Sequence, residues 1–174
     1  MWVTAYTDAS VKDGKSSWSI WLKCSAGRIV RNGLCPKHIK SSTEAETFAA
    51  YQAVLTATKE WSDVEGVQIN TDSTEILGLF WPWSKPSFNA VMREYQYKVW
   101  ELKVKIRTKH VKGHYDDGSV RAYLNARVDN LAGVVTGKYK RKITRMEPKE
   151  RTTIIPFYMQ NAPELGDVPP WDTV

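Results

Sequence analysis

The sequence predicts one mixed α/β domain, a sheet with helices on both faces, followed by a C-terminal tail. The first observation is segment order: three strand-like segments, a helix, a strand, two helices, a strand and a last helix. The second is composition, because 174 residues with 42% hydrophobic and 25% charged residues suit one soluble domain with its own core. The third is the proline-rich stretch that follows the last helical segment.

Three strands are expected in the first 34 residues, at 2–8, 18–24 and 28–34, where aromatic and β-branched residues dominate. Asp13-Gly14 predicts a turn after the first strand, and Ser25-Ala26-Gly27 predicts a hairpin between the other two.

The only two cysteines, Cys24 and Cys35, flank this hairpin. Pairing about Ala26-Gly27 sets Cys24 opposite Ile29 and not opposite Cys35. We therefore expect two reduced thiols.

A helix is predicted from about Ser41 to Trp61, because hydroxyl residues and early acids satisfy the free N–H groups of a first turn. Glu44 fits a capping box with Ser41. Two interpretations stay open for Glu46: it caps the helix with Thr43, or it faces the sheet. The second follows because Glu46 heads a row of small residues at helical spacing that would pack on the sheet. The row is Ala49, Ala50, Ala53 and Ala57.

The second half of the chain predicts two more strands and three helices. The strands are Val67–Asp72 and Lys103–His110, and the helices are Ser73–Phe80, Ser87–Trp100 and Arg121–Val135. Strict alternation gives the last strand a basic outer face, and solvation and edge protection are the usual explanation of such a face.

Four acids are placed where they would meet. Asp8 and Asp72 end two short apolar strands in similar Thr-Asp phrases, Glu46 lies on the sheet-facing helix, and Asp129 shares a face of the last helix with Asn125. Carboxylates that lie so close together repel each other unless a cation or a proton lies between them. Their oxygen atoms suit Mg²⁺ or Mn²⁺, and two such ions about 3.5–4 Å apart serve in-line phosphoryl displacement.

These residues resemble the type 1 ribonuclease H family. Five phrases match it in order over about residues 1–137. They are Thr7-Asp8-Ala9-Ser10, Glu46 with Thr47-Phe48-Ala49-Ala50, Thr71-Asp72-Ser73, Val111-Lys112-Gly113-His114, and Asn125-Ala126-Arg127-Val128-Asp129-Asn130-Leu131-Ala132.

The resemblance implies a ribonuclease H-like fold, a five-stranded mixed sheet with three antiparallel strands and then two parallel ones. It implies an endonuclease that cuts the RNA strand of an RNA–DNA hybrid by a two-metal mechanism, leaving 5′-phosphate and 3′-hydroxyl ends. Asp8, Glu46, Asp72 and Asp129 would be the catalytic acids that bind two Mg²⁺ ions, with Mn²⁺ as a substitute. His114 would assist proton transfer or product release.

The resemblance also implies contacts to the hybrid. Asn125 would support the site, and Ser10 with the Ser41-Ser42-Thr43 cluster would contact backbone and 2′-hydroxyls, where the family usually has asparagines. The chain is too short after Asp72 for the basic handle of some members. Trp81 would line the channel for the DNA strand, with packing in the core as the open alternative.

Charge is distributed unevenly along the chain, whose net charge is +6. Residues 138–151 carry seven bases and two acids, and residues 152–174 carry three acids and no base. We expect a domain at 1–137 and an extension at 138–174. Either the apolar segments of the extension, 154–158 and 169–171, pack back onto the domain, or its basic part grips nucleic acid; its acidic end is a candidate contact for a replication protein. No apolar run approaches the roughly 20 residues of a membrane span, and no signal pattern is present, so a cytoplasmic location is expected.

Two alternatives to hybrid cleavage stay open at this stage. One is a nuclease on the same fold that cuts DNA or branched junctions. The other is a module that binds hybrids without cutting them, although the presence of all four acids favours an enzyme.

Overall fold

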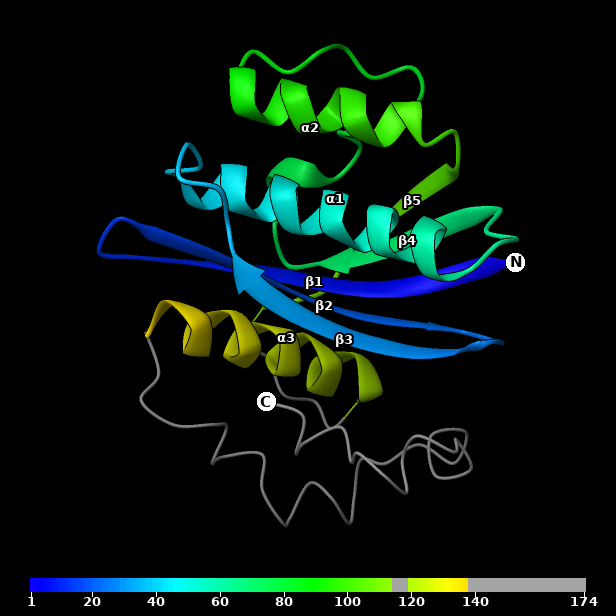
Figure 1. Ribbon diagram of the computed structural model, residues 1–174, viewed down its shortest axis with the longest axis horizontal. Helices are drawn as coiled ribbons and strands as arrows, with labels where there is room; N and C mark the ends of the chain where they lie inside the picture. Colours follow the sequence, from blue (N-terminus) through cyan, green and yellow to red (C-terminus); the bar gives the residue numbers. More distant parts are fainter. Residues whose placement is uncertain (114–118, 138–174) are drawn as a thin grey trace.

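The computed structural model describes residues 1–113 and 119–137, and these form one five-stranded sheet with helices on both faces (Figure 1). The strand order is β3-β2-β1-β4-β5. The neighbours β1–β2 and β2–β3 are antiparallel, and β1–β4 and β4–β5 are parallel, which confirms the predicted mixed sheet. The strands are β1 (Trp2–Lys12), β2 (Lys15–Cys24), β3 (Gly27–Leu34), β4 (Gly66–Thr71) and β5 (Lys105–His110).

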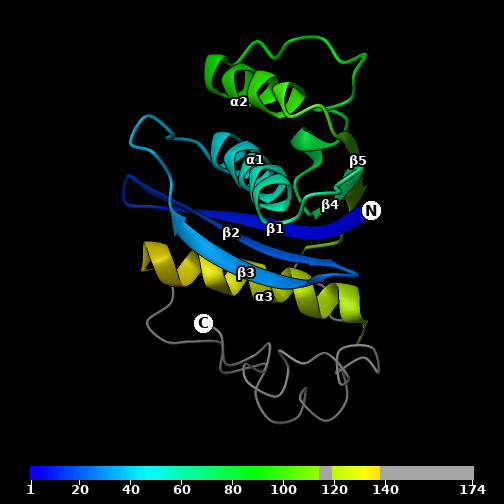
Figure 2. The same ribbon diagram turned by 45° about the vertical axis from the view of Figure 1, so that its right-hand side comes forward.

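Helices α1 (Ser42–Glu60) and α2 (Ala90–Glu101) lie on one side of the sheet, and α3 (Val120–Thr136) lies on the other. Helix α1 packs directly on β1 and β2, whereas α2 packs on α1, further from the sheet (Figure 2). Helix α3 packs on β1, β2 and β3.

The alanine row lets α1 approach the sheet closely, because an alanine methyl group takes little space between backbones. Ala49, Ala50, Ala53 and Ala57 are fully buried, as the sequence predicted. Across from them lie buried residues of the three strands β1, β2 and β4, among them Val3, Ile20, Val67 and Ile69, in a single apolar cluster. On the opposite side, Tyr6 and Trp21 pack against α3.

The register of the β2–β3 hairpin differs from the prediction. Cys24 pairs with Gly27, and Leu22 is the residue opposite Ile29. The turn holds two residues, Ser25 and Ala26, so Gly27 already belongs to the strand and its φ of 150° is open to glycine. Both cysteines are free thiols, as expected.

The β1–β2 hairpin is longer than predicted. Its ladder continues to the pair Lys12–Lys15, and the turn is Asp13-Gly14, where both residues have positive φ. Asp8 therefore lies within a strand, opposite Ser19, and not at a strand end. The ladder extends because small and hydroxyl residues on both strands fit the narrow space under α3, and Ser17 Oγ and Ser19 Oγ donate to α3 carbonyls.

Two other boundaries also differ. The helix expected after Asp72 is a single 3-10 turn, Thr74–Ile76, because Gly78 adopts a positive φ and its N–H bonds Thr108 Oγ1. Helix α2 begins at Ala90 because Asn89 Oδ1 accepts the N–H groups of Val91 and Met92.

In residues 1–113 and 119–137, no helix combines the length and apolar character required to cross a bilayer.

Candidate metal centre

Asp8 lies where the sheet divides. Strand β1 pairs with β4 only as far as Tyr6–Asn70, while β1 itself continues along β2 to Lys12. Beyond Tyr6, no strand of the described part of the chain pairs with β1 on its β4 side. Asp72 follows β4 directly, so it stands beside this unpaired part of β1.

Glu46 comes from the first turns of α1. The capping box belongs to Ser41 and Glu44, whose side chains exchange bonds with each other's backbone N–H groups. Glu46 is therefore not needed as a cap. Its side chain is buried, with 6% of its surface exposed, and it points at Asp8, which decides between the two interpretations of this residue.

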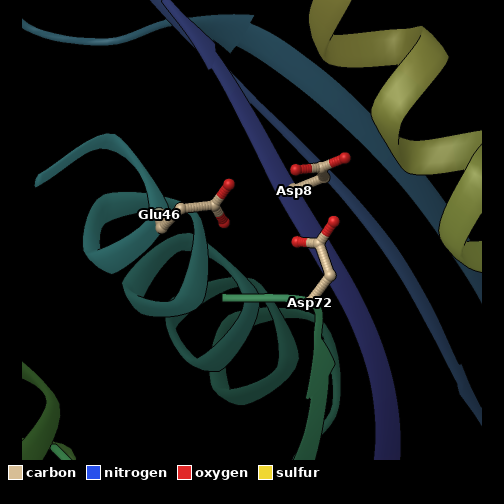
Figure 3. A group of neighbouring side chains, drawn as sticks. All are labelled: Asp8, Glu46 and Asp72. Atoms are coloured by element: carbon tan, nitrogen blue, oxygen red, sulfur yellow. The ribbon is translucent and has the colours of Figure 1, made fainter. Parts of the chain in front are cut away.

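Three carboxylates from three different elements converge. Each of Asp8, Glu46 and Asp72 offers one oxygen atom, and these three atoms lie within 4.8 Å of one another. Figure 3 shows the three side chains pointing toward a shared space between β1, α1 and the end of β4. Oxygen atoms in this arrangement form the type of donor set that Mg²⁺ or Mn²⁺ prefers.

One backbone amide holds two of the acids. The N–H of Ala9 donates to Asp8 Oδ1 at 2.8 Å and to Glu46 Oε1 at 3.1 Å. This amide can do so because it lies on the unpaired side of β1. The other oxygen of Glu46, Oε2, is buried and accepts no N–H or hydroxyl group from residues 1–113 or 119–137.

Burial raises the pKa of Asp8 well above its usual value, and the neighbouring charge of Asp72 raises this pKa further. Burial likewise raises the pKa of Glu46, with Asp8 as the next contribution. The Ala9 amide opposes both shifts. The two acids, when ionised, therefore destabilise the folded protein, and a divalent cation between them would remove this destabilisation. The buried Oε2 of Glu46 is therefore suited to coordinate a metal ion.

Asp129 lies on α3, close enough to Asp8 that its charge contributes to the raised pKa of Asp8. It is buried but is not one of the three acids within 4.8 Å of each other. Asn125, one turn earlier, is also buried, and its Oδ1 has no hydrogen-bond partner among the residues that the structure describes. His114 lies outside the described residues.

The predicted hydroxyl contacts occupy two different environments. Ser10 is buried, and its Oγ lies 3.0 Å from Thr136 Oγ1, so this hydroxyl joins β1 to α3. Ser41 and Ser42 are exposed at the start of α1, and Thr43 is half-buried there. The exposed start of a helix is favourable for an anion such as a phosphate.

Trp81 lies in the loop before α2, with 39% of its surface exposed. Its ring centroid is 5.5 Å from that of Trp83, which is 76% exposed. Neither tryptophan belongs to the apolar core, so the packing alternative does not apply to them.

Two contributors were missed at the sequence level. The amide of Ala9 has no side-chain signal, because any residue except proline carries an N–H. Gly113 was quoted as part of a motif but given no role. A Cβ built on Gly113 would lie 2.6 Å from Asp72 Oδ2, so the chain at this position touches the carboxylate.

Comparison with known proteins agrees with this geometry. The RNase H family model matches residues 2–136. Among solved structures, the RNase H1 of the archaeon Halobacterium salinarum has a TM-score of 0.60 at 17% identity, over 80% of this chain and 100% of that one. LC11-RNase H1, isolated from compost and solved with an RNA/DNA hybrid, has a TM-score of 0.57 at 16% identity, over 78% and 97%.

A third similar structure is the protease–reverse transcriptase of prototype foamy virus, with a TM-score of 0.57 at 22% identity, over 77% of this chain and 20% of that one. No curated protein sequence matches the chain. The predicted ribonuclease H-like fold is confirmed.

Proposed function

The chain belongs to the RNase H family, and we propose that it cleaves the RNA strand of RNA–DNA hybrids with divalent metal ions. The observation that carries the proposal is the convergence of Asp8, Glu46 and Asp72 within 4.8 Å. A similar fold, LC11-RNase H1, was solved with such a hybrid, which supports this substrate class.

In this proposal Asp8, Glu46, Asp72 and Asp129 hold two Mg²⁺ ions. Bound there, the ions supply activation of water and stabilisation of the leaving 3′ oxygen, which gives 5′-phosphate and 3′-hydroxyl ends. The Ala9 amide orients the oxygen atoms of Asp8 and Glu46, so that these ligands need little rearrangement.

The remaining residues would position the substrate. Ser41 and Ser42, exposed beside the positive end of α1, would donate to phosphates or 2′-hydroxyls. His114 follows Gly113, which touches Asp72, and it would transfer a proton to or from the reacting phosphate. Asn125 would support the scissile backbone.

A cleavage assay on four labelled substrates tests the proposal: an RNA–DNA hybrid, double-stranded RNA, double-stranded DNA and a branched DNA junction. With Mg²⁺ we expect the RNA strand of the hybrid to be cut, and with excess EDTA we expect no cutting. Phosphatase and ligase treatment of the products identifies which end carries the phosphate.

Two outcomes would contradict the proposal. Faster cutting of DNA or of the junction than of the hybrid would identify a nuclease of different specificity. Binding to the hybrid without cleavage, in Mg²⁺ and in Mn²⁺, would identify a binding module without activity.

A further inference from the structure

The sheet face that carries α3 is only partly covered by that helix. Helix α3 packs on β1, β2 and β3, and the outer strand β5 lies beyond it. Strand β5 alternates exposed and half-buried residues: Ile106 packs with the core on the α1 side, whereas Lys105, Arg107 and Lys109 are exposed. Because side chains alternate along a strand, these three cations share the face opposite α1.

The same side of the sheet carries two half-buried cations on other strands, Lys23 and Arg28. The pairing register places Arg28 beside Lys23, Lys23 beside Thr4, Thr4 beside Gln68, and Gln68 beside Arg107. Paired residues on neighbouring strands point to the same side of a sheet. The row thus crosses all five strands and contains three basic residues.

We call Lys105, Arg107 and Lys109, the three exposed cations of β5, the basic face. Protection of an exposed edge accounts for the lysines of β5 but not for Arg107, whose guanidinium group lies over an aromatic ring.

An aromatic ring is built into this surface. The guanidinium carbon of Arg107 lies 4.2 Å from the centre of the Trp2 ring. The ring reaches it across Gly66, where a Cβ would come within 2.6 Å of the ring. In the described part of the chain, the acid that pairs with a cation of the basic face is Glu65, which bonds Lys105 at 2.8 Å.

We propose that the basic face binds the phosphate backbone of a nucleic acid, as a site separate from the carboxylate centre. Charge complementarity carries the assignment. The cations of β5 lie on every second residue, about 6.6 Å apart. A nucleic-acid strand carries one negative charge per about 3.4 Å of helix axis, so the spacing of these cations corresponds to every second phosphate. The rival occupant, the acidic segment 152–174, offers three acids in 23 residues.

The face begins beside the metal centre, because Lys109 pairs with Asn70, two residues before Asp72. Its binding function does not depend on hybrid cleavage, since phosphate contacts carry no requirement for RNA or for metal ions.

The test is binding of a fluorescein-labelled 20-base-pair DNA duplex to the full chain in EDTA, followed by anisotropy between 50 and 200 mM salt. The variant R107Q/K109Q is compared with K15Q/K59Q, which removes two exposed lysines away from the basic face. For R107Q/K109Q we expect a three- to ten-fold weaker Kd and a salt slope smaller by about 2, because each phosphate contact contributes about 0.9. The control should behave as wild type.

Equal losses in the two variants would show a general effect of net charge and would overturn the proposal. Unchanged or tighter binding by R107Q/K109Q would also overturn it, and tighter binding would favour the acidic segment as the occupant.

A second measurement uses the wild-type chain and does not depend on the folding of a variant. Lysine acetylation is followed by mass spectrometry with and without the DNA duplex. We expect the duplex to slow acetylation of Lys105 and Lys109 relative to Lys15 and Lys59. Equal rates with and without DNA would contradict the proposal.

Discussion

Asp8 and Glu46 are held together by a single backbone amide, that of Ala9. The arrangement is unfavourable without a cation. Burial raises the pKa of both acids, the charge of Asp72 raises the pKa of Asp8 further, and the charge of Asp8 raises the pKa of Glu46 further. In the absence of metal, a raised carboxyl pKa means that the folded state holds protons more tightly than the unfolded state. The contribution of these acids to stability therefore declines as pH rises above their unfolded pKa of about 4.

Glu46→Gln tests this balance. The amide keeps the shape and removes a charge, so we expect loss of metal-dependent cleavage by at least about 100-fold. In EDTA at pH 8 we expect an increase in the free energy of unfolding of about 0.5–2 kcal/mol. Urea unfolding at pH 5 and pH 8 measures the difference, which should be larger at pH 8.

Addition of Mg²⁺ provides the control. It should stabilise the wild type, because a ligand that binds only the folded state adds to its stability. The variant should gain less. If the variant were less stable than the wild type at pH 8 in EDTA, the buried charge of Glu46 would not be the source of destabilisation proposed here.

Gly113→Ala tests the contact with Asp72. A methyl group 2.6 Å from Asp72 Oδ2 must displace either the loop or the carboxylate. We expect a 10- to 100-fold lower kcat and weaker activation by Mg²⁺, with a change in Tm of only a few degrees.

Gly14→Ala is the matched control for Gly113→Ala. Gly14 has a φ of 74° in a turn with nothing within 4 Å of a built Cβ. Its substitution should lower stability through backbone strain and leave kcat unchanged. Equal kcat values for Gly113→Ala and the wild type would remove the role given to Gly113.

At the scale of elements, the start of α1 is fixed by Glu44. Its carboxylate accepts the N–H groups of Lys40 and Ser41 and the side-chain amide of Asn89, the cap of α2. The N–H of Lys40 is the largest cause that lowers the pKa of Glu44. One side chain thus joins the first turns of two helices, and it sets the position of α1 from which Glu46 projects.

Glu44→Ala should cost about 1 kcal/mol of stability, the usual contribution of a helix cap, because two N–H groups and Asn89 lose their partner. Because the pKa of Glu44 is lowered in the folded state, its contribution is present above its unfolded pKa of about 4.3 and is lost as pH falls. Urea unfolding at pH 7 and pH 3 should show a difference between variant and wild type that shrinks at low pH. Glu101→Ala, at an exposed acid ending α2, should be near neutral, and an equal loss there would contradict the assignment.

At the scale of the whole molecule, the helices on the two sides of the sheet keep the carboxylate centre in place. Glu46 comes from the α1 side, and Asp129 comes from the α3 side. Helix α3 is tied to the sheet through Ser17 and Ser10, whose hydroxyls contact Ala132 and Thr136.

Removal of residues 138–174 tests the predicted division into a domain and an extension. We expect the shortened chain to fold and to cut hybrids at low salt, because the described site lies within 1–137. We expect weaker hybrid binding and a smaller salt slope, because the seven bases of residues 138–151 are lost. Unchanged affinity and slope in anisotropy measurements would show that this segment does not grip nucleic acid.

The sequence by itself predicted the fold and predicted that Asp8, Glu46 and Asp72 lie close together. Alternation of apolar residues placed the strands within a few residues, and the alanine row predicted which face of α1 is buried, since both signals follow from the repeat of side chains along the backbone. The similar Thr-Asp phrases pointed to Asp8 and Asp72, although only Asp72 follows its strand and Asp8 lies within β1.

Only the tertiary structure decided the role of Glu46, since the capping and sheet-facing interpretations use the same helical positions. It also showed the contributions of the Ala9 amide and of Gly113. These depend on where β1 leaves β4 and on how closely two distant segments approach. Local sequence does not encode such distances, because they result from the packing of the whole sheet between its helices.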